Sequence, residues 1–433
     1  MDSLVLAAPS RRFSLGQCGV CAWAAAALLC IAFPVLADES LPGNDVASIR
    51  AWLLAHNPEL RAMQAEADAA QARELPAGAL PDPMIGVRLE GIDRDRPNLL
   101  PGNVDMATYS IRQTVPLWGK RALSREVARG QADAMRLERD AQALALLADA
   151  EQAYVRYWHA DEGLRVIDRL IALLVQVEEV ARERYALGVA AQQDAIRAQV
   201  AGTRMQGERI ERVSMRHEAV AQLNASLGRA ADAPLAQPLT EPILAVPAET
   251  LAEGLAAVRG GHHPAIRARE TLAEAADRAE QLQRRQRLPD LSVGLGAMQQ
   301  GSRLDGYELM LEVEIPLQRR ALREREREAR LMSDAARARV DAEQAALQAR
   351  VGEAWARWAS ARDRRQLFAH TLLPQTEANF ESALSSYRVG EVDFATLLEA
   401  LEAWQGADLS RLDALRDELT RAAELRALIG STP

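Results

Sequence analysis

Three carboxylates recur on one side of an alternating segment near residue 310. Glu308, Glu312 and Glu314 fall at even positions, with Met310 between them, and apolar side chains occupy the odd positions over 307–317. A period of two places successive side chains on opposite faces of a β-strand. The carboxylates therefore share one face, where they would attract cations. A wetted polar wall without ion selectivity is the simpler interpretation of the same pattern.

Adjacent histidines are a second candidate for chemistry, because imidazole binds transition metals. His263 directly precedes Pro264, and proline favours the first turn of a helix. We therefore expect His262 and His263 to mark the start of a helix, without a bound metal. The sequence contains no nucleophile with a base at a recognised spacing, no phosphate-binding glycine loop and no HExxH motif. It thus predicts neither an enzyme nor a cofactor.

The first 37 residues have the organisation of an export signal. Arg11 and Arg12 precede an apolar run, and a small-residue cleavage site ends at Ala37. All three cysteines lie in this segment, so cleavage after Ala37 leaves no thiol for a disulfide, a metal site or catalysis. A retained membrane anchor and lipidation at Cys30 are the less favoured alternatives, the second because Cys30 follows Leu29 and not a small residue.

The charge balance argues against a nucleic-acid partner. The chain has 52 Lys and Arg against 61 Asp and Glu, a formal net charge of -9, and its sequence shows no cationic cluster of the kind that phosphate binding needs. With 26% charged and 48% hydrophobic residues, the composition is that of a folded protein and not of a polytopic helical membrane protein.

An internal repeat organises the chain. Four landmarks recur in the same order about 200 residues later. They are Asn57-Pro58-Glu59-Leu60 with His263-Pro264-Ala265-Ile266, Leu80-Pro81-Asp82 with Leu288-Pro289-Asp290, Val115-Pro116-Leu117 with Ile315-Pro316-Leu317, and Tyr185-Ala186-Leu187-Gly188 with Tyr387-Arg388-Val389-Gly390. We expect a first repeat over 38–233, a proline-rich linker over 234–248 and a second repeat over 249–433.

Each repeat is expected to contain an initial helix and then two strands, near 82–92 and 107–117 in the first half and near 289–299 and 306–317 in the second. Every one of these segments alternates between an apolar face and a polar or small face. Such segments of about ten residues are typical of a membrane barrel. A soluble sheet that lies on a core would show the same alternation.

Long helices follow the strands in each half, predicted over 119–185, 192–228, 319–386 and 393–429. No proline occurs between Pro116 and Pro234, and good helix formers dominate. Pro374 should kink the third of these helices. The first helix carries two adjacent apolar stripes, Val166, Leu170, Leu173, Val177 and Val180 beside Ile167, Ile171 and Leu174. Two stripes predict neighbours on two sides, as in a sheet of helices closed into a tube.

With these features the chain resembles the TolC-like outer-membrane efflux family, and within it the heavy-metal and cation (cobalt-zinc-cadmium type) resistance branch. The resemblance spans about Val46 to Ile429. Besides the duplicated plan, it is carried by the segments TVPLWGKR at 114–121, LLPQ at 372–375 and YRVGEVDF at 387–394.

The resemblance implies a mixed α+β membrane protein that forms a homotrimer. Each chain would give four strands to a twelve-stranded outer-membrane β-barrel, and the long helices would continue it as a periplasmic α-helical barrel. The barrel would dock onto a periplasmic adaptor protein and an inner-membrane pump of the resistance-nodulation-division type. Four strands alone would expose unpaired backbone groups to the lipid, so association is required.

The resemblance also suggests roles for individual residues. The helix breaks would be the periplasmic tips that meet the adaptor, comprising Leu187, Gly188, Val189, Val389 and Gly390. Asp194 and Glu399 match acidic residues near the family's constriction, although Thr396 stands where a second acid can occur. Ordinary turns and solvated helix charges are the alternatives. The residues expected to face the lumen, because charge on the lipid side costs roughly a few kcal/mol, are Arg88, Glu90, Arg112, Glu308, Glu312 and Glu314.

The predicted function is passive conduction of a solute, with heavy-metal cations favoured, as the outer component of a tripartite efflux complex. Drug or protein export is an alternative within the same class. A periplasmic coiled-coil scaffold without a pore is an alternative of another class, against which the four strands argue. The expected surroundings are outer-membrane lipid and periplasm, with no nucleic acid.

Overall fold

Two successive series of helices and strands make up the structure, a computed structural model that describes residues 41–92, 97, 99–246 and 248–430. The predicted export signal, its three cysteines and the cleavage site at Ala37 lie outside these residues. The described chain from Leu41 onward forms one compact unit. No helix within the described ranges has both the length and the hydrophobicity of a membrane span.

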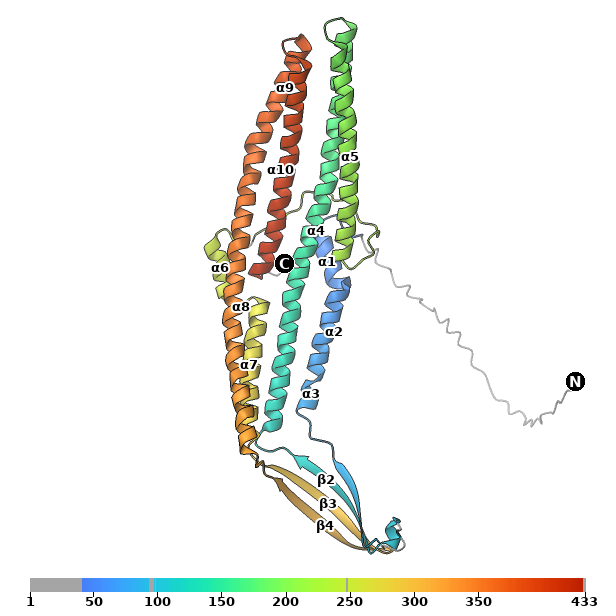
Figure 1. The fold of residues 1–433 in the computed structure, drawn as a ribbon, viewed down its shortest axis with the longest axis vertical. Coiled ribbons are helices and arrows are strands. Elements are labelled where there is room, and N and C mark those ends of the chain that lie inside the picture. The colour runs from blue at the N-terminus through green and yellow to red at the C-terminus, as the bar shows by residue number, and fades with distance from the viewer. Residues whose placement is uncertain (1–40, 93–96, 98, 247, 431–433) are drawn as a thin grey trace, which may run out of the picture. The chain divides into compact units, whose positions relative to one another are not determined.

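The two halves repeat the same order of elements (Figure 1). The first contains α1 (Val46–His56), α2 (Pro58–Ala72), α3 (Glu74–Ala77), β1 (Met84–Glu90), a short 3-10 turn η1 (Pro101–Asn103), β2 (Met106–Val115), α4 (Lys120–Ala186) and α5 (Gln192–Ser226). The second contains α6 (Leu251–Arg259), α7 (Pro264–Arg285), β3 (Asp290–Gln300), β4 (Arg303–Glu314), α8 (Arg319–Leu367), a π-helical turn η2 (Phe368–Leu372), α9 (Leu373–Val389) and α10 (Phe394–Ile429).

The four strands form one antiparallel sheet in the order β1-β2-β3-β4. Strand β2 ends one residue before Pro116, and β4 ends two residues before Pro316. The alternation predicted that these strands would extend to Leu117 and Leu317, which instead lie beyond their ends. Proline has no N–H to donate to a ladder, which accounts for both ends. Among the described residues, β1 and β4 each pair on one side only, which leaves the sheet with two open edges.

The long helices run beside one another as two hairpins, α4 with α5 and α9 with α10 (Figure 1). Helix α4 has 67 residues without a break, which corresponds to about 100 Å. It contacts α5, α7 and α10, in agreement with the two apolar stripes. In the second half, the predicted helix over 319–386 continues to Val389 but contains the π-helical turn η2. Pro374 follows that turn and offers no N–H to the carbonyl of His370, so the helical ladder must change there.

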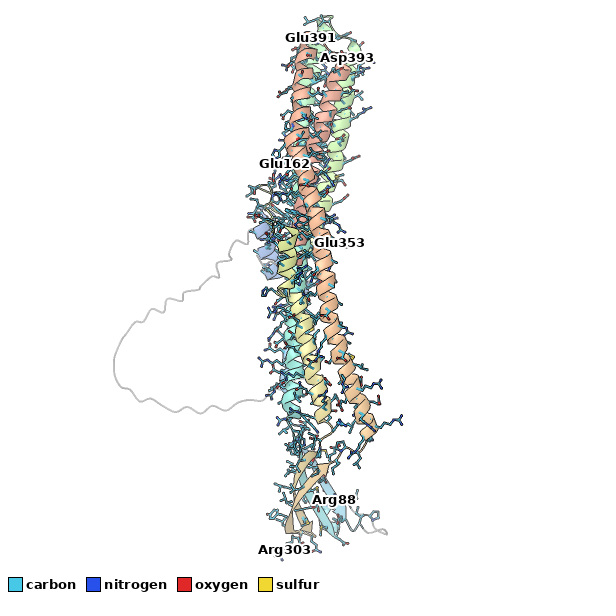
Figure 2. The ribbon with its side chains drawn as sticks, turned by 90° about the vertical axis from the view of Figure 1, so that its left-hand side faces the viewer. Arg88, Glu162, Arg303, Glu353, Glu391 and Asp393 are labelled. Atoms are coloured by element: carbon cyan, nitrogen blue, oxygen red, sulfur yellow. The ribbon has the colours of Figure 1, made fainter. Side chains whose placement is uncertain are left out.

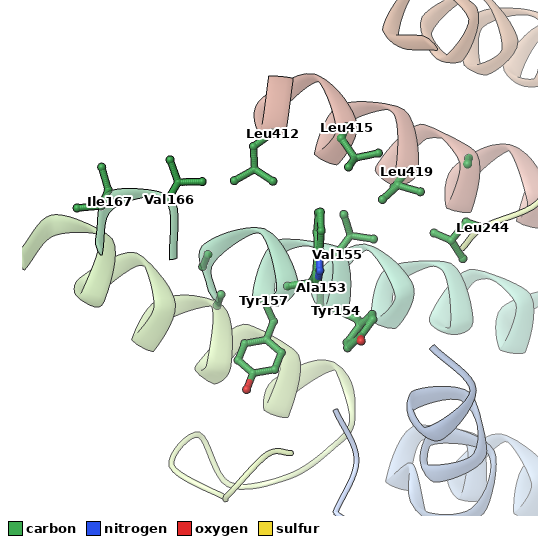
Figure 3. Close-up of a cluster of buried hydrophobic side chains, with 14 of the residues drawn as sticks. Ala153, Tyr154, Val155, Tyr157, Val166, Ile167, Leu244, Leu412, Leu415 and Leu419 are labelled. Carbon is green, nitrogen blue, oxygen red and sulfur yellow. The ribbon is translucent and has the colours of Figure 1, made fainter. Parts of the chain in front are cut away.

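The main core lies where α4 and α10 pack together. Val155 of α4 faces Leu412, Leu415 and Leu419 of α10, and all four side chains are buried (Figure 3). Some polar groups at the margin of this core bond to the backbone. The Tyr154 hydroxyl, for example, donates to the carbonyl of Asn44 at 3.0 Å, and burial raises the pKa of this phenol.

A buried carboxylate links three helices at the same level. Glu151 of α4, only 4% exposed, accepts from Nε of Arg50 in α1 at 2.6 Å, and Nη1 of Arg426 in α10 lies 3.5 Å from its second oxygen. Burial lowers the pKa of Arg426. Removing one partner of such a group leaves charge without its compensation in a medium of low polarity.

We therefore expect Glu151→Ala to be strongly destabilising, because Arg50 would lose the carboxylate it binds and Arg426 would lose one of its partners. The free energy of unfolding should fall by about 3 kcal/mol per chain, measured by denaturant titration. Glu211→Ala, which removes an exposed carboxylate from α5, is the control and should change it by less than about 0.5 kcal/mol. Equal stability of the two variants would contradict the role of Glu151.

The two repeats begin their second helices with the same junction built from different residues. Asn57 caps α2 through Oδ1, which accepts from Glu59 and Leu60, and its Nδ2 donates to the Ser226 carbonyl at the end of α5. His263 caps α7 through Nδ1, which accepts from Ala265 at 3.2 Å, and its Nε2 lies 3.2 Å from the Ala427 carbonyl near the end of α10. His263 thus marks the start of a helix, as the sequence predicts.

The histidine junction should make stability depend on pH. Burial lowers the pKa of His263, with a smaller lowering from Arg350 that is opposed by the Ala427 carbonyl and Glu343. The unfolded chain then takes up the proton more readily than the folded one, so stability present above the ordinary pKa of about 6.5 is lost as pH falls below it.

We expect His263→Asn, which copies the Asn57 junction, to flatten the fall in melting temperature between about pH 7 and pH 5. His217→Asn on the exposed side of α5 should leave the parent slope unchanged, and a His263→Asn slope equal to it would contradict this prediction.

Candidate functional site

All six charged side chains expected on a common strand face lie on that face of the sheet. Opposite residues of paired strands share a face, and the register aligns Ser110 with Gly296 and Gly296 with Glu308. The same pleat includes Arg88, Glu90, Arg112, Glu312 and Glu314. We call this the polar face. It contains four carboxylates and two guanidinium groups among the predicted residues.

One ion pair crosses the polar face. Nη1 of Arg112 in β2 lies 2.9 Å from Oε2 of Glu312 in β4, and its Nη2 lies 3.2 Å from the sulfur of Met310. Gly294 of β3 stands between them, and a Cβ there would come within 3.4 Å of the Met310 Cβ. The missing side chain leaves room for Arg112 to reach across β3. Glu308 and Glu314 form no ion pair with any residue in the described part of the chain.

The opposite face of the sheet is apolar and largely exposed. Ile85, Ile111, Leu295 and Leu309 form one row across the four strands. Ile85 is 82% exposed and Leu309 65%, so no part of the described chain covers this row. Towards η1, Ala107 of the same face is buried. A sheet that lies on a soluble core would bury these residues. A continuous exposed apolar surface of this kind requires a membrane or a protein partner.

The two hairpin turns are built alike. After α4, the N–H groups of Val189 and Gly188 donate to the backbone carbonyls of Arg184 and Tyr185. After α9, the N–H groups of Glu391 and Gly390 donate in the same way to the carbonyls of Ser386 and Tyr387. This is the Schellman arrangement that ends a helix in a left-handed residue, and φ is +73° at Gly188 and +86° at Gly390. We call these two turns the tips; Figure 2 labels Glu391 and Asp393 at the second.

Apolar side chains project from both tips. Leu187 is 77% exposed, Val389 is 72% exposed, and Val189 is likewise exposed. The turns therefore present a small apolar surface in addition to ending the helices.

A contact between the hairpins lies just behind the tips. Tyr387 of α9 is buried to 1% exposure, and its hydroxyl donates to Oδ2 of Asp194, in the first turn of α5, at 3.4 Å. The Arg184 guanidinium lies 4.5 Å over the Tyr387 ring, and the Phe394 ring meets it edge-on. Burial raises the pKa of Tyr387, and the Asp194 charge raises it further. The phenol therefore stays a donor at neutral pH.

The structure does not bring Asp194 and Glu399 together. Asp194 is partly buried against Tyr387, whereas Glu399 is exposed on α10. Thr396, the repeat equivalent of Asp194, donates through its backbone and hydroxyl to Asp393, the N-cap of α10. The sequence identified Tyr387 only as a landmark of the repeat. Its repeat partner Tyr185 is exposed, so no local pattern separates the two roles.

Within the described ranges, no group of three or more His, Cys, Asp or Glu side chains is arranged to hold a metal ion. The two nitrogens of His263 are directed at backbone atoms of α7 and α10.

Comparisons with known proteins agree with this geometry. The profile of the family described as "Outer membrane efflux protein" matches residues 51–229 and 261–431, one segment in each repeat. Among curated proteins no match was found.

Several solved structures have the same fold. CusC, whose description refers to transmembrane channel formation, is 16% identical, with a TM-score of 0.74 over 90% of this chain and 93% of that one. The open-state MtrE channel of Neisseria gonorrhoeae is 17% identical, with a TM-score of 0.72 over 90% of both chains. The outer membrane protein VceC of Vibrio cholerae is 16% identical, with a TM-score of 0.71 over 89% of this chain and 96% of that one. The expected TolC-like fold of four antiparallel strands and long helices is confirmed.

Proposed function

Because the chain belongs to the outer membrane efflux protein family, we propose that it conducts heavy-metal cations passively to the cell exterior, as a homotrimer coupled to a periplasmic adaptor and a pump of the resistance-nodulation-division type. At the level of the family, it is a non-enzymatic outer-membrane efflux channel of a tripartite system. The cation, the trimer of this chain and the class of pump are the proposal.

The exposed apolar face carries the proposal of a membrane barrel. Its residues would face lipid, and the open edges of β1 and β4 would pair between neighbouring copies, since an unpaired edge is not tolerated in a bilayer. Three copies with four strands each give a closed barrel of twelve strands. The polar face then lines the lumen.

The preference for cations rests on the charges of that lumen. Arg112 is paired with Glu312, whereas Glu308 and Glu314 form no ion pair within the described ranges. Rings of such carboxylates attract cations and repel anions. The resemblance to the heavy-metal branch points the same way.

The tips supply the proposed gate and docking surface. The apolar side chains Leu187, Val189 and Val389, together with Gly188 and Gly390, would meet the adaptor. Behind them, the bond from Tyr387 to Asp194 holds the two hairpins of one chain together, so this arrangement favours a narrow tip. Glu399, exposed on α10, would contribute negative charge to the constriction only across the trimer.

The test is single-channel conductance of the purified mature protein in planar bilayers, with its oligomeric mass measured alongside. Stable trimers that give discrete conductance steps are expected. A monomer that never inserts would contradict the channel and favour the coiled-coil scaffold.

The ion preference has its own test. Under a salt gradient, the parent channel should show a reversal potential of the sign for cations. The double change Glu308→Gln, Glu314→Gln should reduce this potential because two carboxylates per chain are lost from the polar face. The control is Glu211→Gln, Glu218→Gln, which removes equal charge from exposed positions of α5. If the parent channel selects anions, or if Glu308→Gln, Glu314→Gln leaves the reversal potential unchanged, drug or protein export would be the better alternative.

A further inference from the structure

Three of the four helix ends that meet the sheet carry positive charge and no negative charge, whereas the fourth, α3, contains Glu74. Segments 120–125, 284–287 and 319–323 contain nine Lys and Arg residues and no Asp or Glu. They belong to the start of α4, the end of α7 and the start of α8. At the other end of the sheet, the described residues of segments 88–105 and 301–305 include two Arg against three Asp and Glu. Positive charge is thus gathered at one end of the strands.

Six of the nine cations have no carboxylate partner among the described residues. Lys120 is bound to Asp290, Arg284 to Glu280, and Arg287 to Glu326. The others form no ion pair with any residue in the described part of the chain, and we call them the arginine collar: Arg121, Arg125, Arg285, Arg319, Arg320 and Arg323. Arg121 and Arg285 donate to the backbone carbonyls of Gly78 and Trp118.

The clearest part of the collar lies at the start of α8. Arg319, Arg320 and Arg323 are all exposed, and their positions in the first turns of a helix place them on one side of it, within about 6 Å of its start. Ile315 and Leu317, exposed at the end of the apolar face, directly precede them. Trp118, which is half exposed, stands just before the start of α4, as Leu317 stands just before the start of α8. Apolar, aromatic and cationic side chains therefore follow one another as they do at a membrane boundary.

We propose that the arginine collar binds the phosphate groups of anionic phospholipids in the leaflet that faces the long helices. The inference rests on the proposed insertion of the sheet into the outer membrane, which places this end of the strands at headgroup level. Guanidinium groups bind phosphate oxygens in pairs of parallel hydrogen bonds, and an anionic surface attracts each such cation. The collar would hold the barrel at a fixed depth.

The collar corrects one expectation from the sequence. The sequence shows no cationic cluster, because the nine residues are distributed over three segments separated by more than thirty residues at the least. These segments come together only because the antiparallel sheet places all three at the end of the strands that meets the long helices.

The test measures which lipid stays on the trimer. Detergent-purified trimer is mixed with equal amounts of phosphatidylglycerol and phosphatidylethanolamine, and the retained lipid is identified by native mass spectrometry. The parent should retain phosphatidylglycerol in preference. The triple change Arg319→Gln, Arg320→Gln, Arg323→Gln should lower this preference at least tenfold, since each arginine near an anionic surface contributes about fivefold. Excess inorganic phosphate should not displace the lipid.

The control triple is Arg204→Gln, Arg259→Gln, Arg339→Gln, which removes the same charge from exposed arginines away from the sheet. It should keep the parent preference for phosphatidylglycerol.

Three results overturn the proposal: an equal loss of this preference in both triples, an unchanged preference in the first triple, or displacement of the lipid by inorganic phosphate. A parent that conducts without preferring phosphatidylglycerol contradicts the collar alone, whereas a parent that neither conducts nor retains lipid contradicts the proposed function as well. If the first triple alters ion selectivity and not lipid retention, its arginines line the lumen and the proposal is wrong.

Discussion

Channels that carry Tyr387→Phe should open far more often than the parent. The change removes the hydroxyl that donates to Asp194 across the two hairpins and keeps the buried ring. A hydrogen bond of this kind contributes about 1 kcal/mol, so three chains together lose about 3 kcal/mol of bias towards the narrow tip, roughly a hundredfold in the ratio of open to closed. Single-channel recording measures this ratio directly as the open fraction. Asp194→Asn should shift it in the same direction, because a neutral amide is a weaker acceptor.

The internal repeat supplies the control for this prediction. Tyr185 occupies the equivalent place before the first tip but is 48% exposed. Tyr185→Phe should therefore leave the open fraction unchanged. If both tyrosine variants open the channel equally, the effect belongs to the tips in general. If neither does, the contact between Tyr387 and Asp194 does not hold the tip closed.

Leu311→Arg should prevent stable insertion of the trimer. Leu311 lies within β4 on the apolar face and is 64% exposed there. An arginine on the lipid side of a barrel costs about 2–4 kcal/mol near the middle of the membrane, and the trimer incurs that cost three times. The measurement is the fraction of protein that assembles into lipid vesicles as a protease-resistant trimer.

Ser110→Arg is the matched control, because it adds the same side chain to the polar face. Ser110 is opposite Gly86 and Gly296, which leave room for a larger residue, and Glu308 lies next in that row. We expect this variant to insert like the parent. Equal insertion of Leu311→Arg and Ser110→Arg would mean that the apolar face does not meet lipid, and the membrane barrel would be wrong.

The local elements of the fold were predictable from the sequence. The period of two in the strands, the helix-forming residues between Pro116 and Pro234, and the glycines at the two hairpin turns each act within a few residues of the chain. The duplicated landmarks then related one half to the other. Strands β2 and β4 end before the alternation does, where Pro116 and Pro316 withdraw a backbone donor.

Contacts between distant segments were decided by the tertiary structure alone. An apolar strand face has the same sequence pattern whether it lies on a core or is uncovered, and only the packing of the helices away from the sheet leaves Ile85 and Leu309 exposed. Tyr185 and Tyr387 occupy equivalent places in the repeat, yet only Tyr387 lies between the hairpins and reaches Asp194.

The same distinction holds for charge. Glu151, Arg50 and Arg426 are far apart in the chain and meet only after the helices have packed. The three arginine-bearing helix ends likewise come to one end of the strands only through the sheet. Periodicity and propensity are properties of neighbouring residues, and so the sequence by itself determined which elements form. Which side chains share an environment depends on how those elements pack, because that packing minimises the free energy of the whole chain and not of any one segment.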